Sequence, residues 1–330
     1  MDKKTILTWC QSTSEQLHIG NYFGAILPLI ELQNKDIYDV WLFVADVHSI
    51  TKILNIKENY PYALWTKDLI KLYIASWVDL NKTTVFRQSD VPAHFQLERV
   101  LACYTHIWFM QRMHAYKDAD NKKELNLMSI GTMNYPIMMA ADILLYDIDI
   151  VPVGKDNQQH MEYCADVAQK FNHRYGPTFK VPWWQVSKEI GEIPGTDGRK
   201  MSKSYNNFLG MLDSPEILRK KINKIVTTDL LPEDPKDPDT CNVYNIVKLF
   251  LDDQEKKELR NKYLAGGMSY KYVKDLLYEK IIWFLWPIQA KFSQISDKEV
   301  EDLLFKNAAI ANQVANNKIA QVYKAIWLWR

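Results

Sequence analysis

Residues 40–45, Val-Trp-Leu-Phe-Val-Ala, form a short apolar run between polar neighbours, and this run decides the fold class. Three further segments have the same character: Thr5–Trp9, Thr83–Phe86 and Ile148–Val153. Helical patterns lie between them, for example over Pro61–Val78 and Met133–Tyr146. Short apolar strands that alternate with helices predict an α/β fold with a parallel sheet covered on both faces. Such sheets bind ligands beyond the carboxyl ends of their strands.

The composition changes near Gly210, beyond which the chain is mostly helical in pattern. Ser214-Pro215-Glu216 has the N-cap, first-turn proline and acid that begin a helix. Three helices are expected after a proline-rich acidic loop, over Val243–Leu264, Ser269–Phe292 and Asp297–Trp329. We therefore expect an α/β domain over residues 1–212 and a helical domain over residues 213–330.

Composition excludes several classes of protein. The 330 residues include 41 Lys and Arg against 40 Asp and Glu, so a net charge of +1 excludes a protein coated by nucleic acid. No apolar run of membrane-spanning length and no signal peptide is present, so we expect a cytoplasmic protein. The four widely spaced cysteines support neither a zinc site nor a redox dithiol, so no protein-held metal is expected: Cys10, Cys103, Cys164 and Cys241.

The string His18-Ile19-Gly20-Asn21 follows the first expected strand and precedes a helix expected to begin near Tyr22. A helix start presents free backbone N–H groups and a positive dipole end, which suit a phosphate. Gly20 would let a ligand approach the backbone closely, and His18 and Asn21 supply side-chain donors. Alone, the string is better explained as a helix-start turn with a glycine for packing.

A second string, Lys200-Met201-Ser202-Lys203-Ser204, follows the loop Pro194–Arg199 with its two glycines and one proline. Two lysines three residues apart on a flexible loop can reach two oxygens of one polyphosphate. Residues 199–224 include seven basic and two acidic residues, a local charge of +5. By itself, however, the lysine pair is better explained as part of a solvated surface loop.

In this order and separation, the two strings resemble the signature of class I aminoacyl-tRNA synthetases, and the closing Asn21 is similar to the tryptophanyl family. Residues 135–160 are more specific, because YPIMMAADILLY followed by DIVPVGKDNQQH resembles bacterial tryptophanyl-tRNA synthetases. The resemblance covers the whole chain. It implies a Rossmann-like doubly wound sheet, with inserted dimerisation and specificity helices in the first domain and a tRNA anticodon-binding role for the second.

The resemblance also implies the activity and a set of nucleotide-binding residues. A tryptophan–tRNA ligase activates L-tryptophan with ATP, releases pyrophosphate and transfers tryptophan to tRNA(Trp); Mg²⁺ is held mainly by ATP, and the enzyme is a homodimer. Lys200 and Lys203 would hold the β and γ phosphates, His18 and Asn21 would lie near the nucleotide, and Lys117 would add a contact. The other implied ATP-binding residues are Gln11, Ser12, Thr13, Gly20, Gly154, Lys155, Asp156, Ile193, Met201, Ser202 and Ser204.

The expected tryptophan site centres on Tyr135, Met139 and Asp142, whose i, i+4, i+7 spacing places them on one helix face. An indole needs a flat apolar slot with one acceptor for its N–H. An acid within Met-Ala-Ala-Asp-Ile-Leu-Leu is badly placed for a pure core, and the resemblance makes Asp142 that acceptor. The other residues implied for this site are Val151, Val153, His48 and Asn157.

Two positions depart from the family pattern. Trp9 stands in place of a glycine in the first loop, where it would crowd the pocket, and Asn157 stands in place of glutamine.

Two alternatives remain open: a tyrosyl-tRNA synthetase, and a non-catalytic paralogue that binds tRNA or nucleotide. The Met139 to Asp142 run argues against the first, and the intact lysine pair against the second. Three tryptophans could stack on bases, although their spacing favours a helix-bundle core: Trp283, Trp286 and Trp327.

Overall fold

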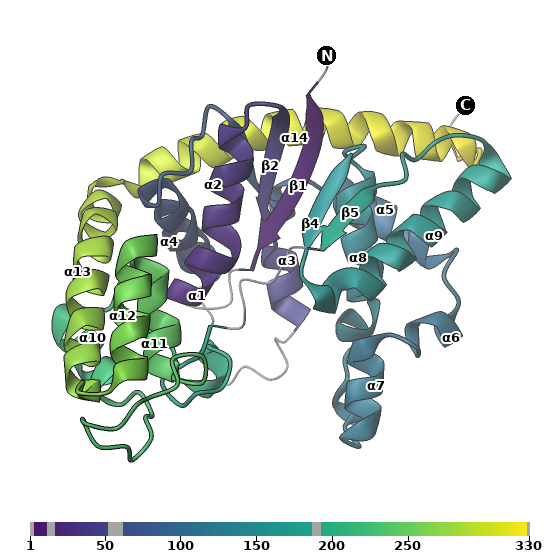
Figure 1. Cartoon of the computed structure of the whole chain (residues 1–330). Helices are drawn as coiled ribbons and strands as arrows, with labels where there is room; N and C mark the ends of the chain where they lie inside the picture. The colour runs from purple at the N-terminus through teal and green to yellow at the C-terminus, as the bar shows by residue number, and fades with distance from the viewer. Residues whose placement is uncertain (1–2, 12–16, 52–61, 187–192, 329–330) are drawn as a thin grey trace.

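A computed structural model of the chain describes residues 3–11, 17–51, 62–186 and 193–328. Within these ranges, five parallel strands form one sheet in the order β3-β2-β1-β4-β5 (Figure 1). The order reverses between β1 and β4, as in a doubly wound fold. The predicted α/β fold class is confirmed. The strands are β1 (Lys4–Cys10), β2 (Tyr38–Val44), β3 (Thr83–Arg87), β4 (Ile150–Val153) and β5 (Trp183–Val186).

The strand β5 is absent from the predicted strands. It pairs only with β4 at the edge of the sheet, and Trp183 is 58% exposed. An edge strand of four residues lacks the continuous apolar run that marked the central strands, which explains why the pattern did not reveal it.

Alternate residues of β2 enter two separate cores, because successive side chains of a strand point to opposite faces. Val40, Leu42 and Val44 join one core with the helices α2, α4 and α10–α13. Trp41 and Phe43 join the other with α5, α8 and α9. Both faces of the sheet are therefore covered, as the apolar run at residues 40–45 predicted. The helices of the α/β part are α1 (Ile19–Asn21), the π-helical η1 (Tyr22–Ile26), α2 (Leu27–Asn34), α3 (Asp46–Ser49), α4 (Tyr62–Ala75), η3 (Gln88–Asp90), α5 (Ala93–Ala102), α6 (Ile107–Met110), α7 (His114–Asn121), η4 (Leu125–Leu127), α8 (Ile130–Leu144), η5 (Lys155–Asn157), α9 (Gln158–Tyr175) and η6 (Lys203–Tyr205).

The second half of the chain is helical, as expected, with one correction. The single helix predicted over Val243–Leu264 is two helices, because Asp252 begins a new one with a capping box to Glu255. Trp283, Trp286 and Trp327 are also exposed rather than core residues, at 80%, 55% and 83%. The helices here are α10 (Pro215–Asn223), α11 (Asn242–Val247), η7 (Lys248–Phe250), α12 (Asp253–Ala265), α13 (Tyr270–Gln294) and α14 (Asp297–Ala325).

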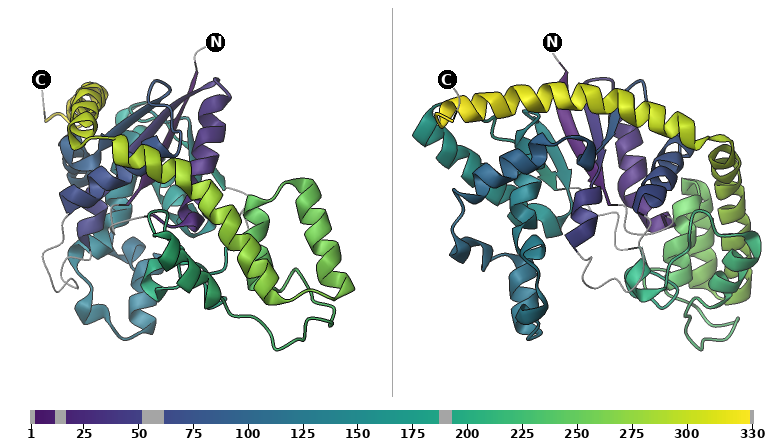
Figure 2. Two further views of the ribbon diagram at one scale, coloured as in Figure 1. Left: turned by 90° about the vertical axis from the view of Figure 1, so that its left-hand side faces the viewer. Right: turned by 180° about the vertical axis from the view of Figure 1, so that it is seen from behind.

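The long helix α14 runs back across the α/β part, as Figure 1 and both views of Figure 2 show. Its first half joins one core through Val300 and Leu304, and its second half joins the other through Ala311 and Ala315. Buried polar groups reinforce this contact. Asn307 Nδ2 donates to the backbone carbonyl of Val85 on the edge strand β3 at 2.9 Å. The division at residue 212 stays a prediction, since both cores include residues from either side of it.

Candidate functional site

The predicted site residues lie mainly where the strands end. β1 ends at Cys10, just before the first string; β2 leads into α3 with His48; β3 leads into Gln88; and β4 leads into Gly154 and η5. The carboxyl ends of parallel strands meet at one edge of a sheet. This edge therefore brings together segments that are far apart in sequence.

The first string forms the N-terminus of α1, which begins at Ile19 rather than near Tyr22. His18 is its N-cap and closes a capping box. Its Nδ1 accepts from the backbone N–H of Asn21 at 3.3 Å, and Asn21 Oδ1 accepts from the backbone N–H of His18 at 3.1 Å. Burial and the neighbouring Lys203 lower the pKa of His18 to about 4. His18 is therefore neutral at pH 7, with Nε2–H left as its donor.

Gly20 lies close to His18 in its own string and to Met201 in the second string, which explains why a residue without a side chain stands there. A Cβ there would stand 2.9 Å from His18 Nδ1 and 3.7 Å from Met201 Sδ. Met201 is buried, and its backbone N–H donates to the carbonyl of Ile193 at 2.8 Å. The structure thus brings together residues of both strings that the resemblance implies for ATP binding.

The two signature lysines differ in their surroundings. Lys200 is exposed, whereas burial lowers the pKa of Lys203 to about 8, partly offset by Cys10. Lys203 acts electrostatically on both Cys10 and His18, so its ammonium group lies near the end of β1 and the start of α1. A lysine at this position can meet a phosphate bound at the helix N-terminus.

Asn207 holds the lysine loop in shape. Its Oδ1 accepts from the backbone N–H of Ser202 at 2.8 Å, while its Nδ2 donates to Asp197 Oδ1 at 2.6 Å and to the Lys200 carbonyl at 3.1 Å. Its own carbonyl accepts from the backbone N–H of Thr196 at 2.8 Å. This buried amide was not among the predicted site residues, because nothing in the sequence separates it from the neighbouring Asn206.

Asp142 is buried in α8, and both of its side-chain oxygens have hydrogen-bond partners. Its Oδ1 accepts from Gln88 Nε2 at 2.8 Å and lies 2.6 Å from His94 Nδ1, while its Oδ2 lies 2.8 Å from His48 Nε2. Burial acts to raise the pKa of Asp142, but its interactions with His48 and His94 prevail and lower it to about 2. The carboxylate is thus ionised and is an acceptor only, as an indole N–H requires.

The other predicted tryptophan-site residues contact His48, follow from it through Tyr135 and His160, or lie in the core on this face of the sheet. Tyr135 forms an edge contact with His48, with ring centroids 6.4 Å apart, and its hydroxyl lies 2.8 Å from His160 Nε2. His160 Nδ1 in turn lies 3.3 Å from Asn157 Oδ1. Met139, Val151 and Val153 are buried in the same core as Asp142's helix neighbours. Trp9 packs on this face against Phe43, with ring centroids 6.1 Å apart.

The sequence missed Gln88, His94 and His160 of this network, and also Tyr146, whose hydroxyl lies 2.8 Å from His94 Nε2. A polar Gln88 directly after a buried strand was one available signal, since the predicted sheet already placed chemistry at strand ends. His94 and Tyr146 carried no such signal, because a lone histidine or tyrosine on an apolar helix is most simply a core residue.

For the remaining predicted residues that the structure describes, it gives a position but no contact that bears on ATP binding. Gln11, Gly154 and Lys155 are exposed near the strand ends, and Lys117 is exposed on α7. Ser12 and Thr13 lie outside the described residues. Asp156 and Ser204 are described only as backbone within η5 and η6. Contacts of all these residues with ATP stay predictions.

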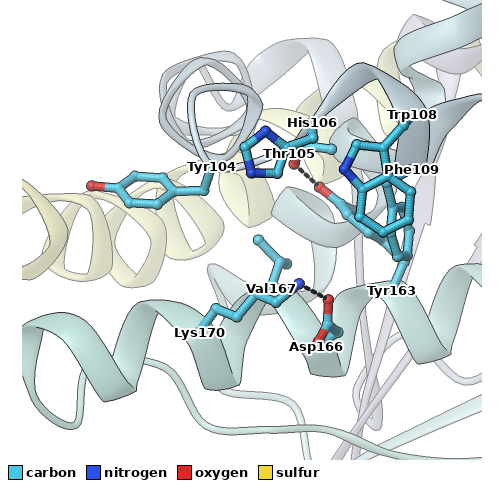
Figure 3. A pocket seen from close by; sticks show the side chains of 9 residues that line it. All are labelled: Tyr104, Thr105, His106, Trp108, Phe109, Tyr163, Asp166, Val167 and Lys170. Atoms are coloured by element: carbon cyan, nitrogen blue, oxygen red, sulfur yellow. Dashed lines mark hydrogen bonds and ion pairs between the residues drawn. The ribbon is translucent and has the colours of Figure 1, made fainter.

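A pocket elsewhere on the molecule includes none of the predicted site residues. Residues of α9 and of the segment 104–109 line a hollow of about 280 Å³, part of which is open to solvent (Figure 3). Thr105 Oγ1 and the Tyr163 hydroxyl share a hydrogen bond of 2.6 Å there.

Within the described ranges, no cluster of three or more His, Cys, Asp or Glu could hold a metal ion, and no helix has the length and apolar character of a membrane span.

The fold and the site together define an α/β nucleotide-binding protein, and comparison with known proteins gives the family. The sequence profile described as tRNA synthetases class I (W and Y) matches residues 2–285. The chain is 38% identical over 318 residues to a tryptophan–tRNA ligase of Fusobacterium nucleatum, covering 94% of each protein. It is 37% identical over 328 residues to that of Campylobacter jejuni, covering 98% of this chain and 99% of the relative. The chain belongs to the class I synthetases of tryptophan and tyrosine and, within them, to the tryptophan–tRNA ligases.

Solved structures agree with this assignment. The tryptophanyl-tRNA synthetase of Campylobacter jejuni, in complex with ADP and tryptophan, matches with a TM-score of 0.87 and 35% identity, covering 98% of this chain and 99% of that one. The enzyme of Mycoplasma pneumoniae matches with a TM-score of 0.78 and 31% identity, covering 98% and 97%. A tyrosyl-tRNA synthetase from Archaeoglobus fulgidus, 18% identical with a TM-score of 0.66, shares the fold alone.

Proposed function

We propose that the chain activates L-tryptophan with ATP, forming tryptophanyl-adenylate and pyrophosphate, and then transfers tryptophan to tRNA(Trp). The observation that carries this proposal is the buried, ionised Asp142 beside His48 and Tyr135, at the same sheet edge as the α1 N-terminus. An acceptor-only carboxylate selects a ligand with one donor, and a helix N-terminus favours a phosphate.

In the first step a carboxylate oxygen of tryptophan bonds to the α-phosphorus of ATP, and the bond from that phosphorus to the bridging oxygen breaks. The electron pair leaves on pyrophosphate, so negative charge must be stabilised on the departing phosphates. Lys203 and Lys200 would supply the positive charge, and neutral His18 would donate through Nε2–H. Asn21 and Gly20 would lie against the nucleotide, and Lys117 would add a further contact.

In the second step a terminal ribose hydroxyl of tRNA attacks the adenylate carbonyl, and AMP leaves. We assign anticodon reading to the helical residues 213–330. The exposed Trp283 and Trp286 on α13 support this assignment, because unstacked RNA bases stack on exposed aromatic side chains.

Three finer features of the function belong to the same proposal. Mg²⁺ enters as the magnesium complex of ATP, held mainly by phosphate oxygens. The chain forms a homodimer; the exposed apolar side chains between α6 and the start of α8 support it, namely Ile107, Trp108, Leu127 and Ile130. The enzyme works in the cytoplasm, where its nucleotide and tRNA substrates are found.

The test is amino-acid-dependent exchange of labelled pyrophosphate into ATP, with tryptophan, tyrosine and phenylalanine in parallel, on the wild type and Asp142→Ala. Exchange with tryptophan only, lost in the variant, is the expected result. Exchange with tyrosine instead would indicate the activity of a tyrosyl-tRNA synthetase. Absence of exchange with every amino acid would favour a non-catalytic paralogue and overturn the proposal.

A further inference from the structure

Behind Asp142 lies a chain of buried side chains that contact the carboxylate but not the open side of the site. We propose that His94, held in one tautomer by Tyr146, is a positioning residue that turns Asp142 so that only Oδ2 is left to accept the indole N–H. This inference rests on the proposed function and adds a determinant of its specificity.

The two oxygens of Asp142 differ in how fully they are used. Oδ1 already has two partners, Gln88 Nε2 at 2.8 Å and His94 Nδ1 at 2.6 Å. Oδ2 has one, His48 Nε2 at 2.8 Å. Each carboxylate oxygen can accept two hydrogen bonds, so the remaining capacity lies on Oδ2.

The same oxygen is the one on the accessible side. The side chains of His94 and Gln88 are fully buried, whereas that of His48 is 10% exposed. A ligand that approaches past His48 and Tyr135 therefore meets Oδ2 first. The inner oxygen is committed to protein donors before any ligand binds.

Tyr146 contacts the ring nitrogen of His94 that faces away from Asp142. Its hydroxyl lies 2.8 Å from His94 Nε2, and burial raises the pKa of Tyr146 well above its usual value, so the hydroxyl keeps its proton. In the proposed arrangement the hydroxyl donates to Nε2, and the Nδ1 proton faces Asp142. Gln88 is oriented in the same way, because its Oε1 accepts from the backbone N–H of His48 at 3.3 Å.

Aromatic rings enclose His94. His94 packs between Phe43, Phe86 and Tyr146, with ring centroids 6.2, 6.4 and 5.6 Å away. Within the described part of the chain, the titratable groups recorded as interacting with Asp142 come from four places: His48 after β2, His94 on α5, Tyr146 after α8 and Cys164 on α9. The carboxylate thus cannot rotate to present Oδ1 without breaking two buried hydrogen bonds.

The experiment compares L-tryptophan with β-(3-benzothienyl)-L-alanine, in which sulfur replaces the indole N–H. The variants are Tyr146→Phe, which keeps the ring, and His94→Gln, which keeps one donor. The measured quantity is the ratio of kcat/KM for tryptophan to that for the analogue in pyrophosphate exchange. We expect each variant to lower this ratio about tenfold or more, since the hydrogen bond to the charged acceptor is misdirected.

The controls separate the possible failures. Tyr104→Phe removes a hydroxyl that bonds to Tyr175 outside this network, and its ratio should equal that of the wild type. If His94 had only a structural role, its replacement would lower kcat/KM equally for tryptophan and for the analogue, and the ratio would not change. That result would overturn the inference without contradicting the wild-type activity. If His94→Gln fails to fold, the isosteric Tyr146→Phe still decides. No tryptophan exchange by the wild type would instead refute the proposed function.

Discussion

The side-chain oxygen of Asn207 accepts a hydrogen bond from the backbone N–H of Ser202 at 2.8 Å, inside the loop that carries both signature lysines. The same side chain donates to the carbonyl of Lys200, so one buried amide spans the loop from Lys200 to Ser202. The geometry of the lysine pair is therefore set by a residue that carries no charge and follows the string.

Replacement of Asn207 by alanine should weaken the binding of ATP and leave the binding of tryptophan unchanged. Loss of side-chain hydrogen bonds worth about 1 kcal/mol each should raise the KM for ATP roughly tenfold. Pyrophosphate exchange at varied ATP and varied tryptophan measures both constants. Asn81→Ala, in an exposed turn before β3, is the matched control. An equal rise in both constants would show that Asn207 has no specific role in the loop.

Gly195 leaves no room for a side chain. A Cβ there would stand 2.3 Å from the Asn207 side chain and 2.6 Å from its backbone oxygen. Gly195→Ala should therefore displace the loop and lower the exchange rate by tenfold or more. Gly24→Ala is the control, because a Cβ at this helical position meets nothing within 4 Å and should be neutral or stabilise by about 1 kcal/mol. Equal activity of the two variants would contradict the expectation.

The lowered pKa of Lys203 predicts an alkaline limit to ATP use. Below its pKa of about 8 the ammonium is charged and can pair with phosphate; as pH rises through 8 the charge is lost. The kcat/KM for ATP should therefore fall above pH 8 in the wild type. Lys203→Arg stays charged throughout, so its profile should lack this fall, whatever its absolute rate. Superimposable profiles would exclude Lys203 as the titrating group.

Asn307 should contribute to the stability of the sheet edge. Asn307→Leu keeps the bulk of the side chain but leaves the Val85 carbonyl without its donor, which should cost about 1–3 kcal/mol in the free energy of unfolding. Asn316→Leu, at an exposed position on the same helix, should change it by about 0.5 kcal/mol at most. Urea unfolding of both variants measures the difference, and equal midpoints would refute the assignment.

Much of the fold could be predicted from local pattern. The strand segments at residues 40–45 and 83–86 are apolar because their faces pack into the cores on either side of the sheet, and burial is visible in sequence. The edge strand at Trp183 and the break at Asp252 were missed, because one depends on a pairing distant in sequence and the other on a cap within a continuous helical pattern. The return of α14 to the sheet was equally hidden, since amphipathicity does not name the partner surface.

Some residues of the candidate site could likewise be predicted from the sequence, and others could not. Asp142 was visible because an acid inside an apolar helix is costly without partners. Its partners His94 and Tyr146 were not, because their role depends on where an imidazole nitrogen and a hydroxyl meet in space. Asn207 was missed for the same reason, as its bonds are set by the path of the loop.

The position of α14 has a consequence for how the protein is made. Asn307 follows its partner Val85 by 222 residues, so a ribosome that adds about 5–20 residues per second takes roughly ten to forty seconds to supply it. During that interval the emerging sheet lacks the cover that Ala311 and Ala315 later give to its apolar face. The nascent chain therefore passes through a period in which its sheet is made but the side of β3 that α14 later covers is open to chaperones and to aggregation.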